Sequence, residues 1–342
     1  MFSRLRFLEM EMLNKKIIFL IILLLALGIV VGVVFLYTQK EISIKNQAAN
    51  IIQEEVKPIS LVFVGDMMFD RSVEKLIDEN GANYPFEKIS DFLKQADLAI
   101  GNLEGPIVKK PIQFSRSSLK FAFSEKTIDG LNFAGFDLLN LANNHTQNMG
   151  QDGLKETREI LKSANMDSFG DPLVCSKDFL FKKDNLIFLG FNKTFPSTCP
   201  DEDILKTIKE IKLSNPESFL IINAHWGNEY QLKNSKQQQE LAYKIIDNGA
   251  DLIIGHHPHV VQNVEKYKNK MIFYSLGNFV FDQYFSEETQ KGMIVNLEIY
   301  PHTKNFGEGV YSDKFIYKTF FVSITDSQPK IAESGEIIEI KK

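Results

Sequence analysis

Beyond residue 58, short runs of apolar residues recur along the chain, and each ends in a few glycines or polar residues. The runs span residues 61–64, 98–100, 138–141, 219–222 and 252–254. Short continuous runs of β-branched and aromatic residues are typical of strands that are buried on both faces. Stretches with helical character alternate with these runs, so the pattern predicts a largely parallel sheet covered by helices.

The helical stretches are expected at residues 71–80, 152–165 and 235–247. The last of them carries apolar side chains on one side and is followed by Asn248-Gly249, a typical helix end. The first two directly follow loops that carry candidate functional residues.

Two further segments extend the pattern. Residues 179–182 and 186–189, joined through a Lys-Asp-Asn turn, are typical of a β-hairpin. After Gly292 the chain returns to strand-like runs, at residues 293–299 and 318–324. The simplest interpretation is one domain of two packed sheets covered by helices.

The N-terminal region has a different pattern. Residues 17–37 form an unbroken uncharged apolar segment, which at ~1.5 Å per residue is long enough to cross a ~30 Å hydrocarbon layer. A cleaved signal peptide is disfavoured because no A-x-A-like site follows the segment. Lys15 and Lys16 precede it, so the positive-inside rule puts the N-terminus in the cytoplasm.

This pattern predicts four parts. Residues 1–16 are expected in the cytoplasm, and residues 17–37 in the cell membrane as a single-pass anchor. Residues 38–57 are polar and are expected to form a stalk. Residues 58–342 would then be the main domain, on the extracytoplasmic side.

Composition narrows the possible partners. The 342 residues carry a formal net charge of −5 and the pI is about 5.8, which argues against nucleic acid as a partner. Cys175 and Cys199 are the only cysteines. In an extracytoplasmic domain they could form a disulfide, and two free thiols are an equally good interpretation.

Side chains that bind metals follow the apolar runs. Five of the six histidines lie in such positions. Because ligands bind beyond the carboxyl ends of strands in open α/β sheets, we expect these side chains to meet at one edge. The candidate metal ligands are Asp66, Glu104, Asn144, His225, His257 and His259.

Each motif also has a structural interpretation. An aspartate such as Asp66 often caps a helix, and Asn143-Asn144 would suit a plain turn. A lone histidine at a strand end, such as His225, is more often structural than a ligand. The strongest motif places three imidazoles within residues 256–259, which is costly unless a cation or water organises them.

The donor set suffices for one or two divalent metal ions, and manganese, zinc and iron all accept mixed carboxylate and imidazole ligands. Three residues are expected to act in catalysis. His145 would protonate a leaving group, and Asn144 would act beside it. Arg71 would hold an anionic group of the substrate, although a solvated helix residue is an equally good interpretation.

Seven segments carry a more specific pattern, at residues 64–68, 101–106, 121–123, 134–145, 223–230, 250–259 and 274–279. In this order they resemble the poly-gamma-glutamate capsule synthesis protein A (CapA) family, within the calcineurin-like metallophosphoesterases. The resemblance covers about residues 60–283. It implies a metallophosphatase-like four-layer α/β/β/α sandwich behind one transmembrane helix, outside the cell, in the synthesis of an anionic capsule polymer.

The chain departs from the pattern at three positions. It has Met68 where metallophosphoesterases carry the histidine of Asp-x-His, and Glu104 where they carry aspartate. It has Asn148 where the capsule family often carries an aspartate. The missing imidazole makes a single-metal or weakly occupied site plausible.

Two functions remain open from the sequence. The leading hypothesis is a metal-dependent hydrolase that cleaves an ester, amide or phosphoester bond of an anionic envelope polymer or its precursor. The alternative is a non-catalytic subunit that binds the polymer and tethers other membrane subunits of a synthesis or export complex. Met68 favours the alternative, and the retained histidines favour the enzyme.

Overall fold

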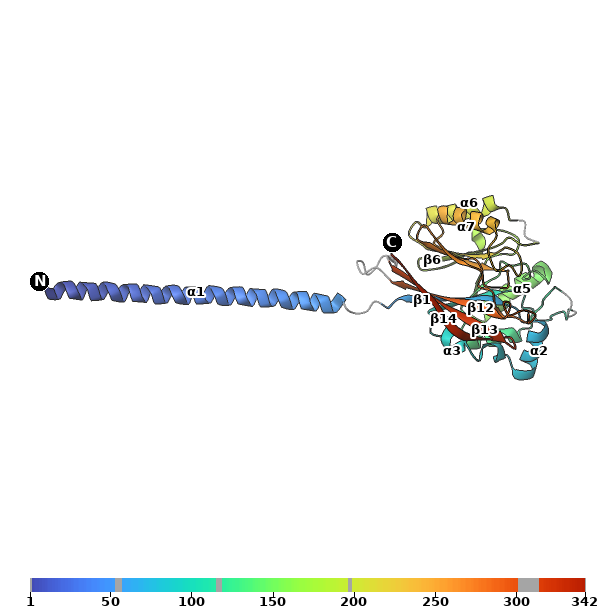
Figure 1. Cartoon of the computed structure of the whole chain (residues 1–342), viewed down its shortest axis with the longest axis horizontal. Helices are drawn as coiled ribbons and strands as arrows, with labels where there is room; N and C mark the ends of the chain where they lie inside the picture. Colours follow the sequence, from blue (N-terminus) through green and yellow to red (C-terminus); the bar gives the residue numbers. More distant parts are fainter. Residues whose placement is uncertain (1, 53–56, 115–118, 196–198, 301–313, 342) are drawn as a thin grey trace. The chain divides into compact units, whose positions relative to one another are not determined.

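The computed structural model of the chain describes residues 2–52, 57–114, 119–195, 199–300 and 314–341 (Figure 1). They divide into two compact units, Met1–Val56 and Lys57–Lys342. The first unit is one helix, and the second contains all the strands that the structure describes.

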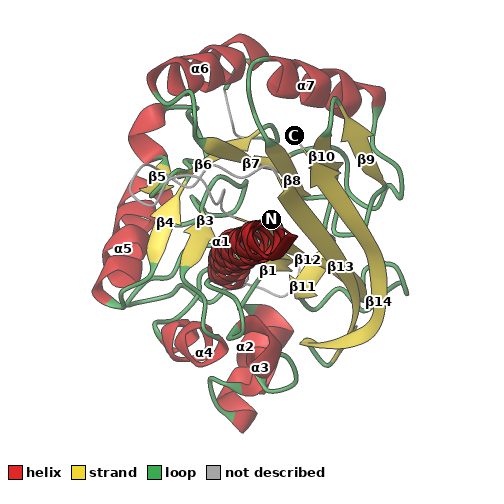
Figure 2. Cartoon of the chain, turned by 90° about the vertical axis from the view of Figure 1, so that its left-hand side faces the viewer, coloured by secondary structure: helices red, strands yellow, loops and turns green. Residues whose placement is uncertain are grey.

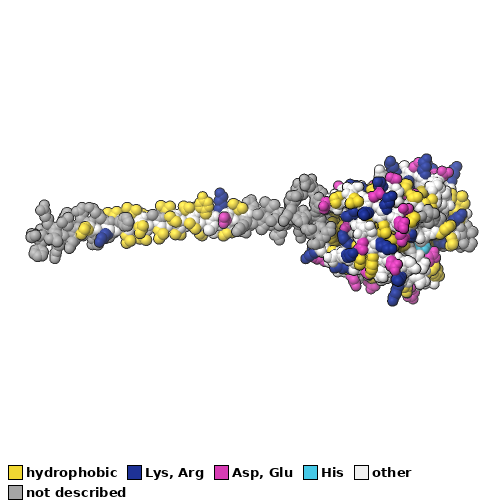
Figure 3. Space-filling view, turned by 90° about the horizontal axis from the view of Figure 1, so that it is seen from above, with side chains coloured by type: hydrophobic (Ala, Val, Ile, Leu, Met, Phe, Trp, Pro, Cys, Tyr) yellow, Lys and Arg dark blue, Asp and Glu magenta, His cyan; other side chains and the backbone are white. Residues whose placement is uncertain are grey.

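The first unit is formed by α1 (Phe2–Ile52). Its segment Leu20–Ile44 is long and apolar enough to cross a membrane, and no other described helix has that length and composition. Apolar side chains lie exposed along this segment, as Figure 3 shows. The predicted span, residues 17–37, overlaps it. The predicted stalk, residues 38–57, is helical as far as Ile52, and residues 53–56 lie outside the described residues.

One sheet of the second unit is built around parallel strands. They are β1 (Ile59–Met67), β2 (Leu98–Leu103), β3 (Leu138–Asn140) and β4 (Asp167–Phe169). On the other side of β1 the sheet continues, antiparallel, with β12 (Lys291–Tyr300), β13 (Lys314–Thr325) and β14 (Gln328–Lys341). The short β11 (Asn278–Val280) pairs in parallel with the end of β1.

The other sheet has the order β5-β6-β7-β8-β10-β9. Its strands are β5 (Phe181–Lys183), β6 (Leu186–Asn192), β7 (Phe219–His225), β8 (Leu252–His256), β9 (Val264–Tyr267) and β10 (Lys270–Phe273). The strands β6, β7, β8 and β10 run parallel, so their carboxyl ends share one edge.

The helices cover the outer faces of the sheets (Figure 2). One side carries α2 (Arg71–Asn80), α3 (Ser90–Leu93), α4 (Lys126–Ala134) and α5 (Gly150–Ser163). The other side carries α6 (Asp201–Ser214) and α7 (Lys236–Asp247). Single 3-10 turns occur at Tyr84–Phe86 and Lys177–Phe179.

Alternate residues of one strand face different layers. In β1, Leu61 and Phe63 pack between the two sheets, whereas Val62 and Val64 pack with the residues of α2 to α5. A third apolar cluster lies between the second sheet and the helices α6 and α7. The described residues therefore form the predicted four-layer α/β/β/α sandwich, and burial on both faces explains why the strand runs are continuously apolar.

Local predictions were confirmed where strong patterns supported them. The helix predicted at 71–80 is α2, and α5 and α7 lie within two residues of the other two predicted helices. The predicted hairpin is β5–β6, which pair antiparallel. Helices α4 and α6 and strand β14 were not predicted.

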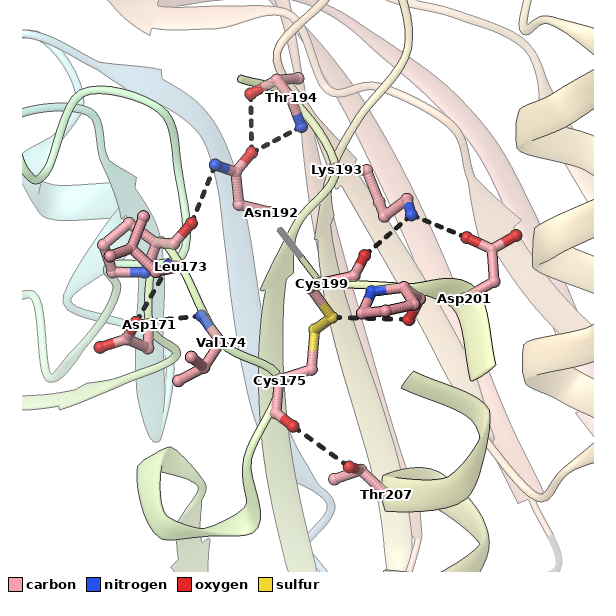
Figure 4. Close-up of a disulfide and its surroundings, with 12 residues drawn as sticks. Asp171, Leu173, Val174, Cys175, Asn192, Lys193, Thr194, Cys199, Asp201 and Thr207 are labelled. Carbon is pink, nitrogen blue, oxygen red and sulfur yellow. Dashed lines mark hydrogen bonds and ion pairs between the residues drawn. A yellow bond between two sulfur atoms is a disulfide. The ribbon is translucent and has the colours of Figure 1, made fainter. Parts of the chain in front are cut away.

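Cys175 and Cys199 form a disulfide near the open end of this hairpin (Figure 4), with their Cα atoms 5.8 Å apart. Thr207 of α6 donates to the carbonyl oxygen of Cys175 at 3.3 Å. Nζ of Lys193 donates to the carbonyl oxygen of Cys199 at 2.9 Å. Of the two interpretations of these cysteines, the structure has the disulfide.

Candidate metal centre

Polar side chains from both sheets converge beyond the carboxyl ends of their strands. Asp66 lies near the end of β1, Glu104 directly follows β2, and His225 ends β7. His257 and His259 follow β8. All five are buried, with at most 7% of the residue exposed. The predicted edge is thus the place where the carboxyl ends of two sheets meet.

Glu104 lies at the centre of this cluster. Its Oε1 lies 3.6 Å from Nε2 of His259 and 3.9 Å from Nε2 of both His145 and His225. Neither carboxylate oxygen has a hydrogen-bond partner among the described residues. Burial and, after it, the negative charge of Asp66 raise the pKa of Glu104 well above its usual value. A buried carboxyl group without a partner is costly, and a cation would remove that cost.

Asp66 is surrounded by hydrogen-bond donors. Its Oδ1 accepts from Nδ2 of Asn102 at 2.8 Å and lies 3.2 Å from Nδ1 of His256. Its Oδ2 accepts from the backbone N–H of His257 at 3.2 Å and lies 3.3 Å from Nδ1 of His259. Burial raises the pKa of Asp66, but His256 and His259 outweigh burial, and the pKa lies well below its usual value. Asp66 is therefore an anion.

The partners of His259 decide which ring nitrogen faces the cluster. Nδ1 lies 3.0 Å from Oδ1 of Asn278, whose Nδ2 donates to the carbonyl oxygen of Thr289 at 2.9 Å. Asn278 thus presents its oxygen, so His259 donates from Nδ1 and directs Nε2 toward Glu104. Burial lowers the pKa of His259, but the charges of Glu104 and Asp66 raise it to about 9. A metal at Nε2 would displace the proton held there.

His225 and Asn144 meet between the two sheets. Nε2 of His225 lies 2.8 Å from Oδ1 of Asn144, and Nδ1 lies 3.4 Å from Nδ2 of Asn102. Burial lowers the pKa of His225 well below its usual value, so the imidazole is neutral. Because an amide oxygen only accepts, Nε2 of His225 donates to Asn144 in this state, and the two side chains would become uncharged metal ligands once that proton moves to Nδ1.

His145 has a fixed tautomer. Oδ1 of Asn148 accepts from the backbone N–H of Phe121 at 2.7 Å and lies 3.1 Å from Nδ1 of His145. His145 therefore donates from Nδ1, and its Nε2 faces Glu104 with a free lone pair. Burial lowers the pKa of His145 to about 4, so the ring is neutral at pH 7. In this state Nε2 accepts a proton before it can donate one.

Arg71, the predicted anion-binding residue, already has a carboxylate partner. Its Nη2 donates to Oδ1 of Asp282, whose Oδ2 accepts from the backbone N–H of Ser72 at 3.2 Å. The guanidinium lies 4.9 Å from the ring centre of Phe121 and 5.8 Å from that of Phe281. Its Nε is buried and has no hydrogen-bond partner in the described part of the chain. One N–H of Arg71 is thus left without an acceptor among the described residues.

The turn that carries His257 and His259 is strained. Their φ angles are 94° and 57°, in the left-handed region that side chains rarely adopt. Each such residue costs about 1–3 kcal/mol, and strain of this kind concentrates at functional sites. Both imidazoles reach the cluster because the backbone takes this shape.

Asn102 links three strands and was not among the predicted site residues. Its Nδ2 donates to Asp66, and its Oδ1 accepts from Nδ2 of Asn140 at 3.0 Å and of Asn143 at 3.2 Å. Asparagine is depleted in strands, so an asparagine within an apolar strand such as β2 was the available clue. His256, Asn278 and Glu229 belong to motifs recognised in the sequence, but they were not among the predicted site residues.

The donor atoms fit a divalent metal. Three overlapping triads occur, and within each triad the donor atoms lie within 4.8 Å of one another. The triads are Asp66, Glu104 and His259; Glu104, His225 and His257; and Glu229, His257 and His259. Carboxylate oxygens and imidazole nitrogens at this spacing, around an oxygen pair without partners, suit a divalent cation.

The chain is similar to bacterial capsule synthesis proteins. The family model described as "Bacterial capsule synthesis protein PGA_cap" matches residues 60–173 and 182–283. The capsule biosynthesis protein CapA of Bacillus anthracis is 35% identical over 270 residues, which cover 72% of this chain and 65% of that protein. The PGA biosynthesis protein CapA of Bacillus subtilis (strain 168) is 32% identical over 255 residues, which cover 69% and 67%.

The chain therefore spans about two thirds of the length of these curated relatives. Among solved structures, the calcineurin-like phosphoesterase YfkN from Bacillus subtilis is similar at 15% identity and a TM-score of 0.34. That similarity covers 83% of this chain and 91% of YfkN.

Proposed function

The chain belongs to the bacterial capsule synthesis family PGA_cap, and from this premise we propose that it is a metal-dependent hydrolase of capsule-polymer synthesis. It would cleave an ester, amide or phosphoester bond of an anionic envelope polymer or its precursor. The observation that carries the proposal is Glu104, a fully buried carboxyl group without hydrogen bonds, facing three imidazole nitrogens.

The ligand set in this proposal is the predicted one. Asp66 and Glu104 would supply negative charge and His225, His257 and His259 would supply ring nitrogens, with the amide oxygen of Asn144 beside them. A divalent ion bound there would act as a Lewis acid and lower the pKa of water.

The remaining chemistry falls to two residues. His145 would accept a proton at Nε2 from the attacking water and return it to the leaving group, because its neutral ring faces the cluster through that atom. Arg71 would hold an anionic group of the substrate through Nε, since Nη2 is engaged by Asp282.

The proposed location is the outer face of the cell membrane. The apolar side chains of α1 would lie in the bilayer, with Lys15 and Lys16 on the cytoplasmic side. The disulfide between Cys175 and Cys199 supports an extracytoplasmic domain, because disulfides persist in oxidising surroundings. The polymer and other membrane subunits of its synthesis complex would then be the partners.

Metal content tests the centre directly. The full-length chain, purified in detergent without chelators, should contain close to one or two divalent ions per molecule. The His257→Ala/His259→Ala variant should contain none, with an unchanged circular dichroism spectrum. Alanine keeps the Cβ at both strained positions, so it adds no backbone strain. Wild-type protein that takes up neither manganese, zinc nor iron would refute the metal centre.

A second experiment separates ligands from proton transfer. The His145→Ala variant should retain the metal and lose hydrolysis of any substrate that the wild type cleaves. Loss of the metal in this variant would instead assign His145 as a ligand.

A non-catalytic tethering subunit is the second candidate, and one observation favours it. Met68 lies in the apolar cluster beneath α2 to α5, and its Sδ accepts from the backbone N–H of Asp70 at 3.0 Å. This side chain therefore adds no donor to the metal cluster. Polymer binding that survives complete metal removal, with no hydrolysis of any substrate tested, would favour this candidate.

A further inference from the structure

One carboxylate near the cluster is not among the residues predicted from the sequence. Glu229 follows β7 and is exposed, unlike Asp66 and Glu104. It nevertheless forms a triad with His257 and His259, with donor atoms within 4.8 Å of one another.

The three triads share residues in a regular way. Glu104 and His257 share a triad with His225, and Glu104 and His259 share one with Asp66. The third pair, His257 and His259, shares a triad with Glu229. Two of the outer residues, His225 and Asp66, are fully buried. Of the three outer residues, Glu229 is therefore the one that solvent reaches.

The backbone holds Glu229 in this position. The N–H of Tyr230 donates to the carbonyl oxygen of Pro258 at 2.8 Å, which ties the turn after β7 to the turn between the two histidines. Tyr230 has a φ of 61°, and its hydroxyl accepts from Nε2 of Gln283 at 3.2 Å. The hydrogen bond fixes the backbone next to Glu229 relative to the turn that carries His257 and His259.

His257, which shares the triad with Glu229, has one ring nitrogen without a partner in the described part of the chain. Nδ1 of His257 is buried without a hydrogen-bond partner among the described residues, and the whole residue is 7% exposed. A cation bound between His257 and Glu229 would give the buried nitrogen a partner and would neutralise the carboxylate.

The charge of the cluster also favours Glu229 as a ligand. Asp66 and Glu104 together balance one divalent ion, and a second ion in the same cluster would need further negative charge. Among the described residues, Glu229 carries an exposed carboxylate that forms a triad with two of the cluster's histidines. We propose that Glu229 is a metal ligand, which binds an ion on the solvent side of the centre together with His257 and His259.

This inference rests on the proposed metal centre, and the test uses metal binding rather than activity. The full-length chain is stripped with a chelator and titrated with Mn²⁺, and free Mn²⁺ is followed by electron paramagnetic resonance. Glu229→Gln should raise the Kd of the weaker Mn²⁺ site at least about tenfold, because it replaces a charged ligand with an uncharged side chain of the same shape. The visible absorption of the Co²⁺-loaded protein should change in the same variant.

Glu287→Gln is the matched control, since it removes one negative charge from a side chain that is 89% exposed and pairs with Lys291. It should bind Mn²⁺ as the wild type does. Equal affinity of Glu229→Gln and wild type overturns the role of Glu229 and leaves the metal centre standing. Equal weakening in both variants also overturns it, because a long-range charge effect would then suffice. A wild type that binds no metal overturns the metal centre and this inference together.

Discussion

Acidic side chains lie at both ends of the two sheets, and their surroundings differ. At the amino ends, three aspartates directly precede β2, β3 and β8, and each accepts a backbone hydrogen bond from the neighbouring strand. The pairs are Asp97 with Ser60 at 2.9 Å, Asp137 with Ala99 at 2.8 Å and Asp251 with Leu220 at 2.9 Å. Asp251 also pairs with Lys212 and Lys270.

At the carboxyl ends the carboxyl groups face imidazoles instead. Glu104 and Asp251 are both buried, yet neither oxygen of Glu104 accepts a hydrogen bond from a described residue. Burial alone therefore does not distinguish a structural carboxylate from a functional one. The partners distinguish the two. Asp251 accepts from a backbone N–H and pairs with lysines, which stabilises the fold, whereas burying the two oxygens of Glu104 without donors is unfavourable until a cation binds.

The sharpest test of this comparison is Glu104→Gln. It should weaken Mn²⁺ binding at least about hundredfold, or about 2.7 kcal/mol, because Glu104 belongs to two of the three triads. It should also raise the free energy of unfolding of the metal-free protein by about 1 kcal/mol or more, since it removes a buried ionisable group without partners. Metal titration and thermal unfolding in chelator measure the two effects. A loss of both metal affinity and stability would show that Glu104 is structural, as Asp251 is.

The counterpart at the other end is Asp251→Asn. It should lower the free energy of unfolding by about 2 kcal/mol and leave metal affinity unchanged, because it leaves two lysines without their partner. The lysine side chains are 20% and 24% exposed, which keeps the loss below that of a fully buried pair. Asp247→Asn is the control: its pair with Lys268 is exposed, so a change within about 0.5 kcal/mol is expected. Weaker metal binding in Asp251→Asn would contradict the separation of the two ends.

Asn102→Ala tests what holds the carboxyl end together. It removes the amide between Asp66 and His225 and leaves Nδ2 of Asn140 without that acceptor. Mn²⁺ affinity should fall about tenfold, because residues that orient metal ligands have effects of this size. Asn80→Ala, which removes an exposed amide at the end of α2, is the control and should bind metal normally. Unchanged affinity in Asn102→Ala would mean that Asp66 is oriented by its other donors alone.

The sequence predicts the carboxyl ends well for a physical reason. A strand buried on both faces needs a continuous apolar run, and polar residues at its end stand out against that run. The helix caps are equally local: Ser235 and Gln238 form a capping box at the start of α7. For α6, Ile204, Ile208 and Ile211 have the helical period, so the sequence contained a signal that the prediction did not use.

The remaining features depend on contacts that no local pattern encodes. The strand β14 is charged and half exposed, and its antiparallel pairing with β13 stabilises it as a strand. Arg71 and Asp282 are far apart in sequence, so the pairing that restricts Arg71 could not be read from either motif. The placement of Glu229 depends on a backbone hydrogen bond between two turns. The strand-end motifs thus predict that the carboxylates and imidazoles meet at one edge, and the fold decides which further side chains join them and which have partners.

The smallest effect expected is a pH dependence of opposite sign at the two ends. Burial raises the pKa of Asp251, but Lys270 and Lys212 outweigh burial and lower it. Its stabilisation is therefore complete above the unfolded-state pKa of about 3.9 and is lost as the pH falls through the lower folded-state pKa. Burial raises the pKa of Glu104, so its contribution is lost as the pH rises from about 4.3 toward the folded-state pKa.

In chelator, the difference in free energy of unfolding between wild type and the less stable Asp251→Asn should therefore increase as the pH is raised from about 3 to 6. Over the same range, Glu104→Gln should become increasingly more stable than wild type. As the pH rises, wild type therefore gains stability from Asp251 and loses stability at Glu104. Thermal unfolding of the three proteins across this range measures both gaps. If wild type gained stability at both positions as the pH rose, Glu104 would have a stabilising partner in the folded protein. The contrast between the two ends would then be one of degree, and the surroundings of Glu104 would no longer indicate a bound cation.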